Sequence, residues 1–191
     1  MPRLPFANGL VRKLWSTEAH RLETHLLRLD REARAMRFGH GVSETFIKDY
    51  ASRLPDPYYI VFAYVEDGAV RGVAELRMLE QSWSCDAEAA FSVERPWREQ
   101  GIGTELMGHV LRAARNRNVT QLHMACVTEN RTMQHIAQKH EAQLRYEYGT
   151  VTGDIIPDGP SISSLTDEAI ADTRGFVMAV LDLQTTLFKA A

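Results

Sequence analysis

Two glycines separated by a single residue, Gly101 and Gly103, stand between an apolar run and a helical pattern. Glycine permits tight turns and lets backbone N–H groups come close to a ligand. At the start of a helix, those N–H groups and the helix dipole favour an anion such as a phosphate. Arg98 and the hydroxyl of Thr104 add donors beside them. Segment 98–104 therefore predicts an anion site, and the alternative is a tight strand-to-helix turn without a ligand.

Segment 98–104 matches neither of the two best-known phosphate motifs. It lacks the Gly-Lys-Ser/Thr ending of a nucleoside-triphosphate loop. The third glycine of the dinucleotide-binding fingerprint would fall at Leu106 and is missing. Both motifs fail on specific residues, so neither of these nucleotide-binding classes is predicted.

Apolar periodicity and turn residues place segment 98–104 among alternating strands and helices. Alternating or continuous apolar runs predict strands over 10–15, 58–65, 70–79, 87–93, 121–127 and 144–148. Apolar residues at three- and four-residue spacing predict helices over 17–38, 44–54, 102–114, 132–140 and 165–188. Asp67-Gly68 predicts a hairpin, and a further turn is expected at 82–84. This pattern predicts a mixed α/β (α+β) fold.

The composition is that of an ordinary globular protein. The chain has 191 residues, of which 45% are apolar and 25% charged, which disfavours disorder and coiled coils. No apolar run approaches the ~18 residues of a membrane span, and residues 1–11 lack the apolar core of a signal peptide. A formal net charge of −3 disfavours a polyanionic partner. We therefore expect a cytoplasmic protein without a nucleic-acid or membrane partner.

Cysteines and histidines do not form a predicted metal site. The chain has two cysteines and seven histidines, and none of them shows clustered ligand spacing. The cysteines are expected to be free thiols, and the histidines, His25 among them, to be surface or packing residues.

The residues from Phe91 to Leu106 resemble a characteristic segment of the GCN5-related N-acetyltransferase (GNAT) superfamily. They read FSVERPWREQGIGTEL, with Arg-x-x-Gly-x-Gly following a strand that a proline bounds. Asn130 then follows the next predicted strand. The predicted order of elements over residues 10–150 also resembles that of the superfamily.

This resemblance implies a fold, two regions and an activity. The expected fold is a mixed, mostly antiparallel central sheet flanked by helices, with an acetyltransferase domain over 1–156. A helical extension over 157–191 is expected to pack on this domain or on a partner chain, which would make a homodimer. The implied reaction transfers the acetyl group of acetyl-coenzyme A (acetyl-CoA) to a primary amine by direct attack, through a tetrahedral intermediate. The acceptor is either a small molecule or the amine of a protein or peptide.

The resemblance also implies which residues contact acetyl-CoA. The diphosphate is expected on the turn and helix start formed by Arg98, Gln100, Gly101, Ile102, Gly103 and Thr104. The pantetheine arm is expected beside the strand residues Phe91, Ser92 and Val93, where the N–H of Val93 would polarise the thioester carbonyl. Asn130 would bond the pantetheine or cap the following helix, and the sequence leaves both roles open.

Acyl transfer to an amine requires a proton acceptor, and two glutamates are candidates. Glu88 interrupts the apolar run 87–93. Burying a carboxylate costs free energy, so a glutamate on a largely buried strand needs a reason. Related acetyltransferases often carry a glutamate at this place, so Glu88 is our expected general base. Glu75 is the second candidate. The alternative for Glu88 is a solvent-facing position, or pairing with Arg77 of the neighbouring strand.

Two departures from the superfamily pattern bear on the mechanism. Ala137 stands where many members carry a tyrosine that protonates the departing thiolate, and Gln100 replaces a common basic residue. Either another side chain supplies the proton, the candidates being Tyr146, Tyr148, Ser92 and Cys126, or the thiolate leaves without an acid. A non-catalytic acyl-CoA-binding or regulatory module is therefore the alternative function.

Overall fold

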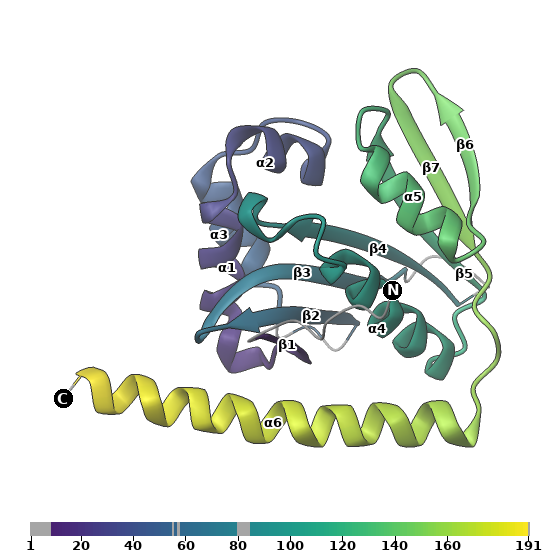
Figure 1. Ribbon diagram of the computed structural model, residues 1–191. Helices are drawn as coiled ribbons and strands as arrows, with labels where there is room; N and C mark the ends of the chain where they lie inside the picture. The colour runs from purple at the N-terminus through teal and green to yellow at the C-terminus, as the bar shows by residue number, and fades with distance from the viewer. Residues whose placement is uncertain (1–8, 55, 57, 80–84, 191) are drawn as a thin grey trace.

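A seven-stranded sheet in the order β1-β2-β3-β4-β5-β7-β6 forms the centre of the molecule (Figure 1). The computed structural model describes residues 9–54, 56, 58–79 and 85–190, with side chains as far as residue 184. The strands are β1 (Gly9–Lys13), β2 (Tyr59–Glu66), β3 (Ala69–Met78), β4 (Asp86–Val93), β5 (Gln121–Val127), β6 (Gln143–Glu147) and β7 (Thr150–Ile155). Strands β4 and β5 are parallel, and the other neighbours are antiparallel. The predicted mixed, mostly antiparallel sheet is confirmed.

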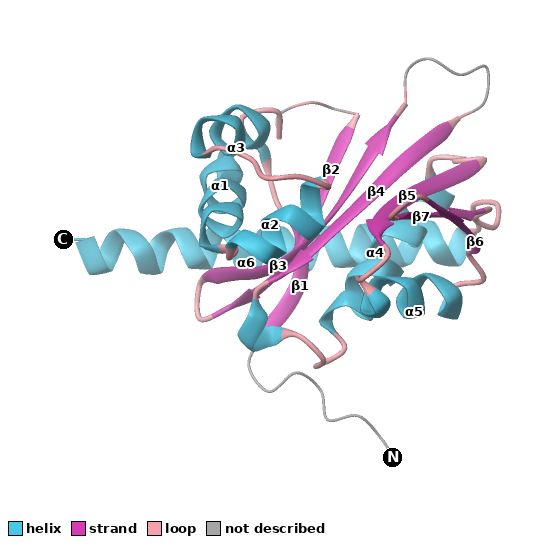
Figure 2. Ribbon diagram, turned by 90° about the horizontal axis from the view of Figure 1, so that it is seen from above, coloured by secondary structure: helices cyan, strands magenta, loops and turns pink. Residues whose placement is uncertain are grey.

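Helices cover both faces of this sheet (Figure 2). One face carries α1 (Ala19–Arg28), α2 (Arg31–Phe38) and α3 (Glu44–Ala51), and the other carries α4 (Ile102–Asn116) and α5 (Arg131–Lys139). Short 3₁₀ turns, η1 (Ser16–Glu18) and η2 (Arg95–Trp97), precede α1 and α4. Each face has its own apolar core, so β4 presents alternate side chains to two different environments.

The single helix predicted over 17–38 is wrong, because the chain breaks between α1 and α2. Leu29 is extended with ψ 133°, and the Asp30 carboxylate accepts a hydrogen bond from the Ala33 N–H at 2.8 Å. Asp30 is thus the N-cap of a new helix. The apolar stripe continues across the break, so periodicity alone does not reveal it.

The single strand predicted over 144–148 is also incomplete, because the chain turns and forms β7. Tyr148 and Gly149 make a two-residue hairpin turn with φ of 29° and 89°. Strand β7 contains Gly153 and Asp154, which are poor strand formers, and this hides it in the sequence. The turn expected at 82–84 lies outside the described residues.

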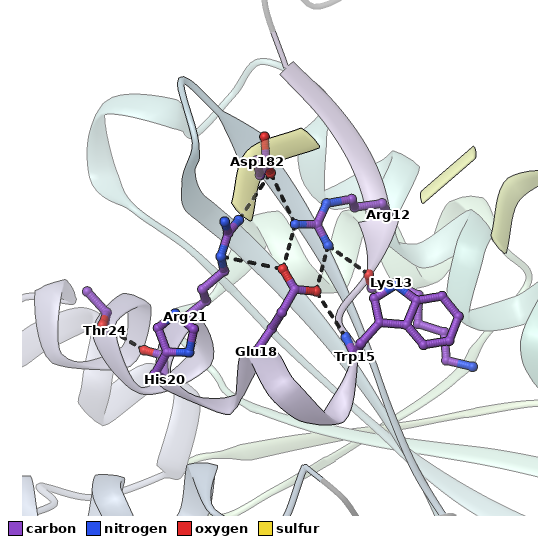
Figure 3. Close-up of polar contacts among 8 residues, drawn as sticks. All are labelled: Arg12, Lys13, Trp15, Glu18, His20, Arg21, Thr24 and Asp182. Carbon is purple, nitrogen blue, oxygen red and sulfur yellow. Dashed lines mark hydrogen bonds and ion pairs between the residues drawn. The ribbon is translucent and has the colours of Figure 1, made fainter. Parts of the chain in front are cut away.

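The C-terminal helix α6 (Ile162–Ala190) packs on its own chain, against β1 and α4, and its end projects past the body (Figure 1). Its Asp182 lies 3.3 Å from Arg12 and 3.2 Å from Arg21, beside the buried Arg12–Glu18 ion pair (Figure 3). The apolar run of this helix is expected to pack on the domain or on a partner chain, and within the single chain Val177 is 51% exposed and Leu183 is 59% exposed. Acidic side chains hold α6 in place, and part of its apolar surface stays in solvent. Among the described helices, none has the length and apolar character needed to cross a bilayer.

Candidate functional site

Strands β4 and β5 pair at one end and separate at the other. In the described residues they pair from Asp86 to Ala89 of β4, after which β5 pairs with β7 alone. The end of β4, Ala90 to Val93, therefore pairs only with β3. Its other edge has no strand partner, so backbone groups on that edge are open to an extended ligand.

Two backbone N–H groups of β4 point to this open edge. The backbone N–H of Glu94 donates to the Arg71 carbonyl at 2.9 Å, so this N–H faces β3. Backbone groups alternate along an antiparallel pair, and the N–H groups of Val93 and Phe91 consequently face away from β3. The Val93 carbonyl points the same way and accepts a hydrogen bond from Arg98 Nε at 3.1 Å. This alternation places the Val93 N–H on the open edge of β4, and its role toward a thioester stays a prediction.

A groove of about 390 Å³ runs from this open edge to the start of α4. Helices α2 and α5 form its walls. The predicted donor-binding residues that line it are Phe91, Ser92, Val93, Arg98, Gly101, Ile102, Gly103, Thr104 and Asn130. Arg37, Arg131 and Lys139 also line it and add positive charge. The structure thus brings together all the predicted acetyl-CoA contacts except Gln100.

The N-terminus of α4 has the geometry of an anion site. Gly101 is the N-cap residue with φ of 87°, a left-handed conformation that favours glycine. The N–H groups of Ile102 and Gly103 belong to the first turn, where a helix offers them no partner of its own. A Cβ on Gly103 would lie 2.9 Å from Ile136 Cδ1, so glycine also lets α5 approach α4 closely.

Two predicted contacts are partly engaged elsewhere. The Gln100 side chain is exposed and donates to the Pro96 carbonyl at 2.9 Å. The Asn130 oxygen accepts from the Met133 N–H at 3.1 Å and caps α5. Of the two roles left open for Asn130, the cap is therefore present.

Glu88 lies on the face of β4 opposite to α4 and is exposed. Its neighbours across the sheet are Arg77 of β3 and His123 of β5. Ala87 and Ala89 are buried because they face α4, and alternation turns Glu88 to the other side, beyond the end of the α1–α3 layer. The expectation that Glu88 sits in a largely buried setting is thus wrong, and it does not line the groove.

Glu75, the second candidate base, is the centre of a buried polar cluster. It is 2% exposed and pairs with Arg37 at 2.6 Å. The hydroxyls of Tyr50 (2.7 Å) and Tyr59 also donate to it. Burial opposes ionisation, but the charge of Arg37 and these hydroxyls hold the pKa of the Glu75 carboxyl below its usual range. The same burial and the nearby carboxylate raise the pKa of Tyr50 to about 12. Glu75 is held as an anion and orients Arg37 at the groove wall.

A family model described as the acetyltransferase (GNAT) family matches residues 17–141. The chain belongs to the acetyltransferase (GNAT) family. The suspected superfamily membership is thereby confirmed. A search of the sequence among curated proteins finds no match.

Solved structures with the GNAT fold resemble this chain at low sequence identity. The GNAT domain of PAT from S. lividans is 18% identical, with a TM-score of 0.66, over 76% of this chain and 89% of that one. The acetyltransferase yncA from Salmonella typhimurium, solved with its cofactor acetyl-CoA, is 12% identical, with a TM-score of 0.62, over 81% and 97%. RimL, a ribosomal L7/L12 alpha-N-protein acetyltransferase solved with coenzyme A, is 13% identical, with a TM-score of 0.60, over 83% and 99%. At these identities the likeness concerns the fold.

In this GNAT domain, a hydrogen-bonded chain that the sequence did not reveal reaches the groove through Ser92. His25 Nε2 lies 3.0 Å from Ser92 Oγ, and His25 Nδ1 lies 3.2 Å from Glu94 Oε1. His25 is completely buried, so the prediction of an ordinary surface or packing histidine missed its two polar partners. One signal was available: position 25 lies on the apolar stripe of Leu22, Leu26 and Leu29, and a histidine buried there needs hydrogen bonds.

The four side chains considered as proton donors in place of the missing tyrosine lie in different places. Tyr146 is 56% exposed on β6, and Tyr148 is fully exposed in the β6–β7 turn. Burial raises the pKa of the Cys126 thiol on β5, which does not line the groove. Ala137 itself lies on the inner face of α5 and is buried in the core. Among the four, Ser92 is the one at the groove.

Proposed function

We propose that this GNAT chain is an acetyl-CoA-dependent N-acetyltransferase that acts on a primary amine by direct attack. The open edge of β4 leading to the α4 N-terminus supports this proposal most directly. An extended pantetheine pairs with such an edge as an added strand would, and a diphosphate suits the free N–H groups at the helix start. The described basic side chains of the groove complement the negative charge of coenzyme A.

The N–H groups of β4 supply the main catalytic term of this proposal. A donor aimed at the thioester oxygen binds the tetrahedral oxyanion more strongly than the ground-state carbonyl. In comparable sites such a donor contributes about 3 kcal/mol to the rate. Val93 and Phe91 carry the N–H groups that face the open edge, and the position of both is fixed by the pairing of β4 with β3.

Detection of thiol release with a panel of primary amines tests the proposed activity. The expected result is acetyl-CoA consumption that depends on an amine and yields the N-acetyl product by mass spectrometry. The panel must contain polyamines, amino sugars and peptides with free N-termini. If acetyl-CoA binds by calorimetry and no amine is acetylated, the non-catalytic acyl-CoA-binding module is the better description. Ala137 and the displaced Gln100 side chain are the observations that favour this second function.

Glu88 is proposed as the group that takes the first proton from the acceptor ammonium. Its exposed carboxylate faces the side of the sheet on which α2 walls the groove, and it does not line the groove itself, so the proposed proton transfer runs through water. Glu88→Gln is expected to lower kcat at neutral pH, with recovery at high pH where the amine is already free. Glu147→Gln, another exposed strand glutamate, is the matched control. Equal turnover of Glu88→Gln and the control across pH removes Glu88 from the mechanism.

A homodimer through α6 is proposed as the assembly. Its exposed apolar residues in the C-terminal half of the helix, Val177 and Leu183 among them, offer an apolar surface to a second copy of the chain. Val177→Glu with Leu183→Glu is expected to convert the dimer to a monomer in light-scattering chromatography. Ile162→Glu, at the other end of α6, is the control. A wild-type protein that is monomeric at high concentration contradicts the proposal.

A further inference from the structure

Three buried polar networks tie the α1–α2 layer to the rest of the molecule, and they differ in what they offer a ligand. The Arg12–Glu18 pair binds Asp182 of α6, away from the groove. The Glu75 carboxylate is surrounded by Arg37 and two tyrosine hydroxyls. The third network, Ser92–His25–Glu94, ends on Ser92, a residue that lines the groove. A hydroxyl both donates and accepts a proton. Tyr50 and Tyr59 do not line the groove, so of these three networks the Ser92 network is the one that brings a hydroxyl residue to it.

The Glu94 carboxylate determines which nitrogen of the His25 ring carries the proton. Glu94 is held by Arg28 at 2.9 Å and by Arg71 at 3.1 Å. Burial acts against its ionisation, but the hydrogen bonds from His25 and Arg28 lower the pKa of the Glu94 carboxyl, which is therefore an anion. A carboxylate at Nδ1 requires a proton on that nitrogen, because two lone pairs would otherwise face each other. In neutral His25 the Nε2 lone pair then faces Ser92 and accepts its hydroxyl proton.

We propose that Ser92 is a catalytic residue that carries a proton from the attacking nitrogen to the departing sulfur, with His25 as its proton store and Glu94 as a positioning residue. This inference rests on the proposed function. An ammonium must lose two protons to become an amide, and Glu88 removes only the first. After the C–N bond forms, Ser92 Oγ takes the second proton from nitrogen while its own proton passes to His25 Nε2. As the C–S bond breaks and its electron pair moves to sulfur, the proton returns from His25 through Ser92 to the thiolate.

This relay completes the reaction without any other acid. The nitrogen loses the proton that the sulfur gains, so His25 ends each cycle neutral, with its proton still on Nδ1 and hydrogen-bonded to Glu94. The relay also accounts for Ala137, because it supplies the proton that a tyrosine hydroxyl at this position of α5 would otherwise donate. Residues 25 and 94 are 69 positions apart, and β4 brings Ser92 and Glu94 to the same face of the strand because they are two positions apart.

The decisive kinetic variant is Ser92→Ala, compared with Thr24→Ala, a neighbouring hydroxyl of α1 that bonds the His20 carbonyl and lies outside the groove. We expect kcat to fall roughly 10²-fold in Ser92→Ala, a typical loss for proton transfer. Acetyl-CoA affinity, measured by calorimetry without an acceptor, is expected to stay within about twofold, because the hydroxyl acts after binding. Ser92→Thr keeps the hydroxyl and is expected to restore most of kcat. If the role of Ser92 were purely structural, Ser92→Thr would lose as much kcat as Ser92→Ala, because threonine is larger than serine.

Measurements on the ligand-free protein test the relay independently of turnover. In ¹⁵N-resolved NMR spectra of the histidine rings at pH 8, the neutral His25 ring is expected to carry its proton on Nδ1. His25→Gln is expected to lower kcat by at least tenfold, and His20→Gln, an exposed neighbour on α1, to leave it unchanged. A proton on Nε2, or a kcat in Ser92→Ala equal to wild type, overturns the relay. If wild type acetylates no amine, the proposed function fails instead, whatever the NMR result.

Discussion

The two walls of the groove differ in the chemical groups that they present to a ligand. On the α4–α5 wall, the first N–H groups of α4, placed by Gly101 and Gly103, form a backbone anion site, and the Arg131 and Lys139 side chains of α5 add positive charge beside it. On the opposite wall, which we call the α1–α2 wall because α2 lines it and His25 of α1 supports it from behind, the groups are side chains held by buried networks. Arg37 is fixed by Glu75, and Ser92 of β4 is bonded to His25.

This difference suits the two substrates of an acyl transfer. A backbone cradle recognises the common part of coenzyme A and depends on chain geometry rather than on residue identity. Side-chain networks hold charge and move protons, which is what the reacting amine needs. We therefore expect the two walls to respond to mutation differently: the α1–α2 wall through removal of charge, and the α4–α5 wall through changes in backbone conformation.

Glu75→Leu is expected to have the largest effect on stability. It leaves the Arg37 guanidinium buried without its carboxylate, and breaking a buried pair in this way costs about 3–5 kcal/mol. Urea unfolding followed by circular dichroism measures this loss. The double variant Glu75→Leu/Arg37→Leu is the control and is expected to recover most of it, since no charge is then stranded. A double variant no more stable than the single one would show that the ion pair is not the cause.

Acid is expected to weaken the same wall. The pKa of Glu75 lies below its usual 4.5 in the folded chain, so the unfolded chain binds the proton more readily. The stability that Glu75 contributes is present above about pH 4.5 and falls as the pH drops through the folded value. The difference in unfolding free energy between wild type and Glu75→Gln should therefore shrink in acid. A difference that is constant from pH 7 to pH 3 contradicts this assignment.

Gly101→Val is expected to break the opposite wall while leaving its charges in place. A β-branched residue at φ of 87° is strained, and relief of that strain moves the N–H groups of α4. Acetyl-CoA binding measured by calorimetry should weaken about 100-fold, which is about 2.7 kcal/mol. Gly108→Ala on the same helix is the control, because a Cβ there meets nothing within 4 Å. It should bind as wild type and gain about 0.5–1 kcal/mol in stability. Wild-type affinity in Gly101→Val would refute the backbone cradle.

Asn130→Ala is expected to have the smallest effect, since it removes one cap from the α5 side of the groove. Loss of an N-cap side chain costs about 1 kcal/mol of unfolding free energy. Asn130→Asp keeps an oxygen acceptor for the Met133 N–H and should be nearly as stable as wild type. A loss of acetyl-CoA affinity in Asn130→Ala that exceeds its loss of stability would assign the amide nitrogen a direct contact with the ligand.

Sequence alone predicted most of the elements that position the groove, because their signals are local. Strand β5 begins and ends where its apolar run predicted, and α4 starts directly after the glycine that its left-handed N-cap requires. The family resemblance rested on the same local features, since a tight turn at a helix start demands particular residues at particular spacing. Local signals failed where Asp30 restarts a helix within one apolar stripe and where Gly153 and Asp154 interrupt the strand-forming residues of β7.

Only the tertiary structure decided which side chains meet. The partners of Glu75 and His25 come from other elements, and no periodicity within one element shows which residues of a distant strand will face it. Burial then determines their chemistry: Glu75 becomes a structural anion, Glu88 turns to solvent, and Ser92 gains a histidine. The chain thus encodes the backbone cradle in seven consecutive residues, whereas the proton chemistry arises from packing α1 and α2 against β3 and β4.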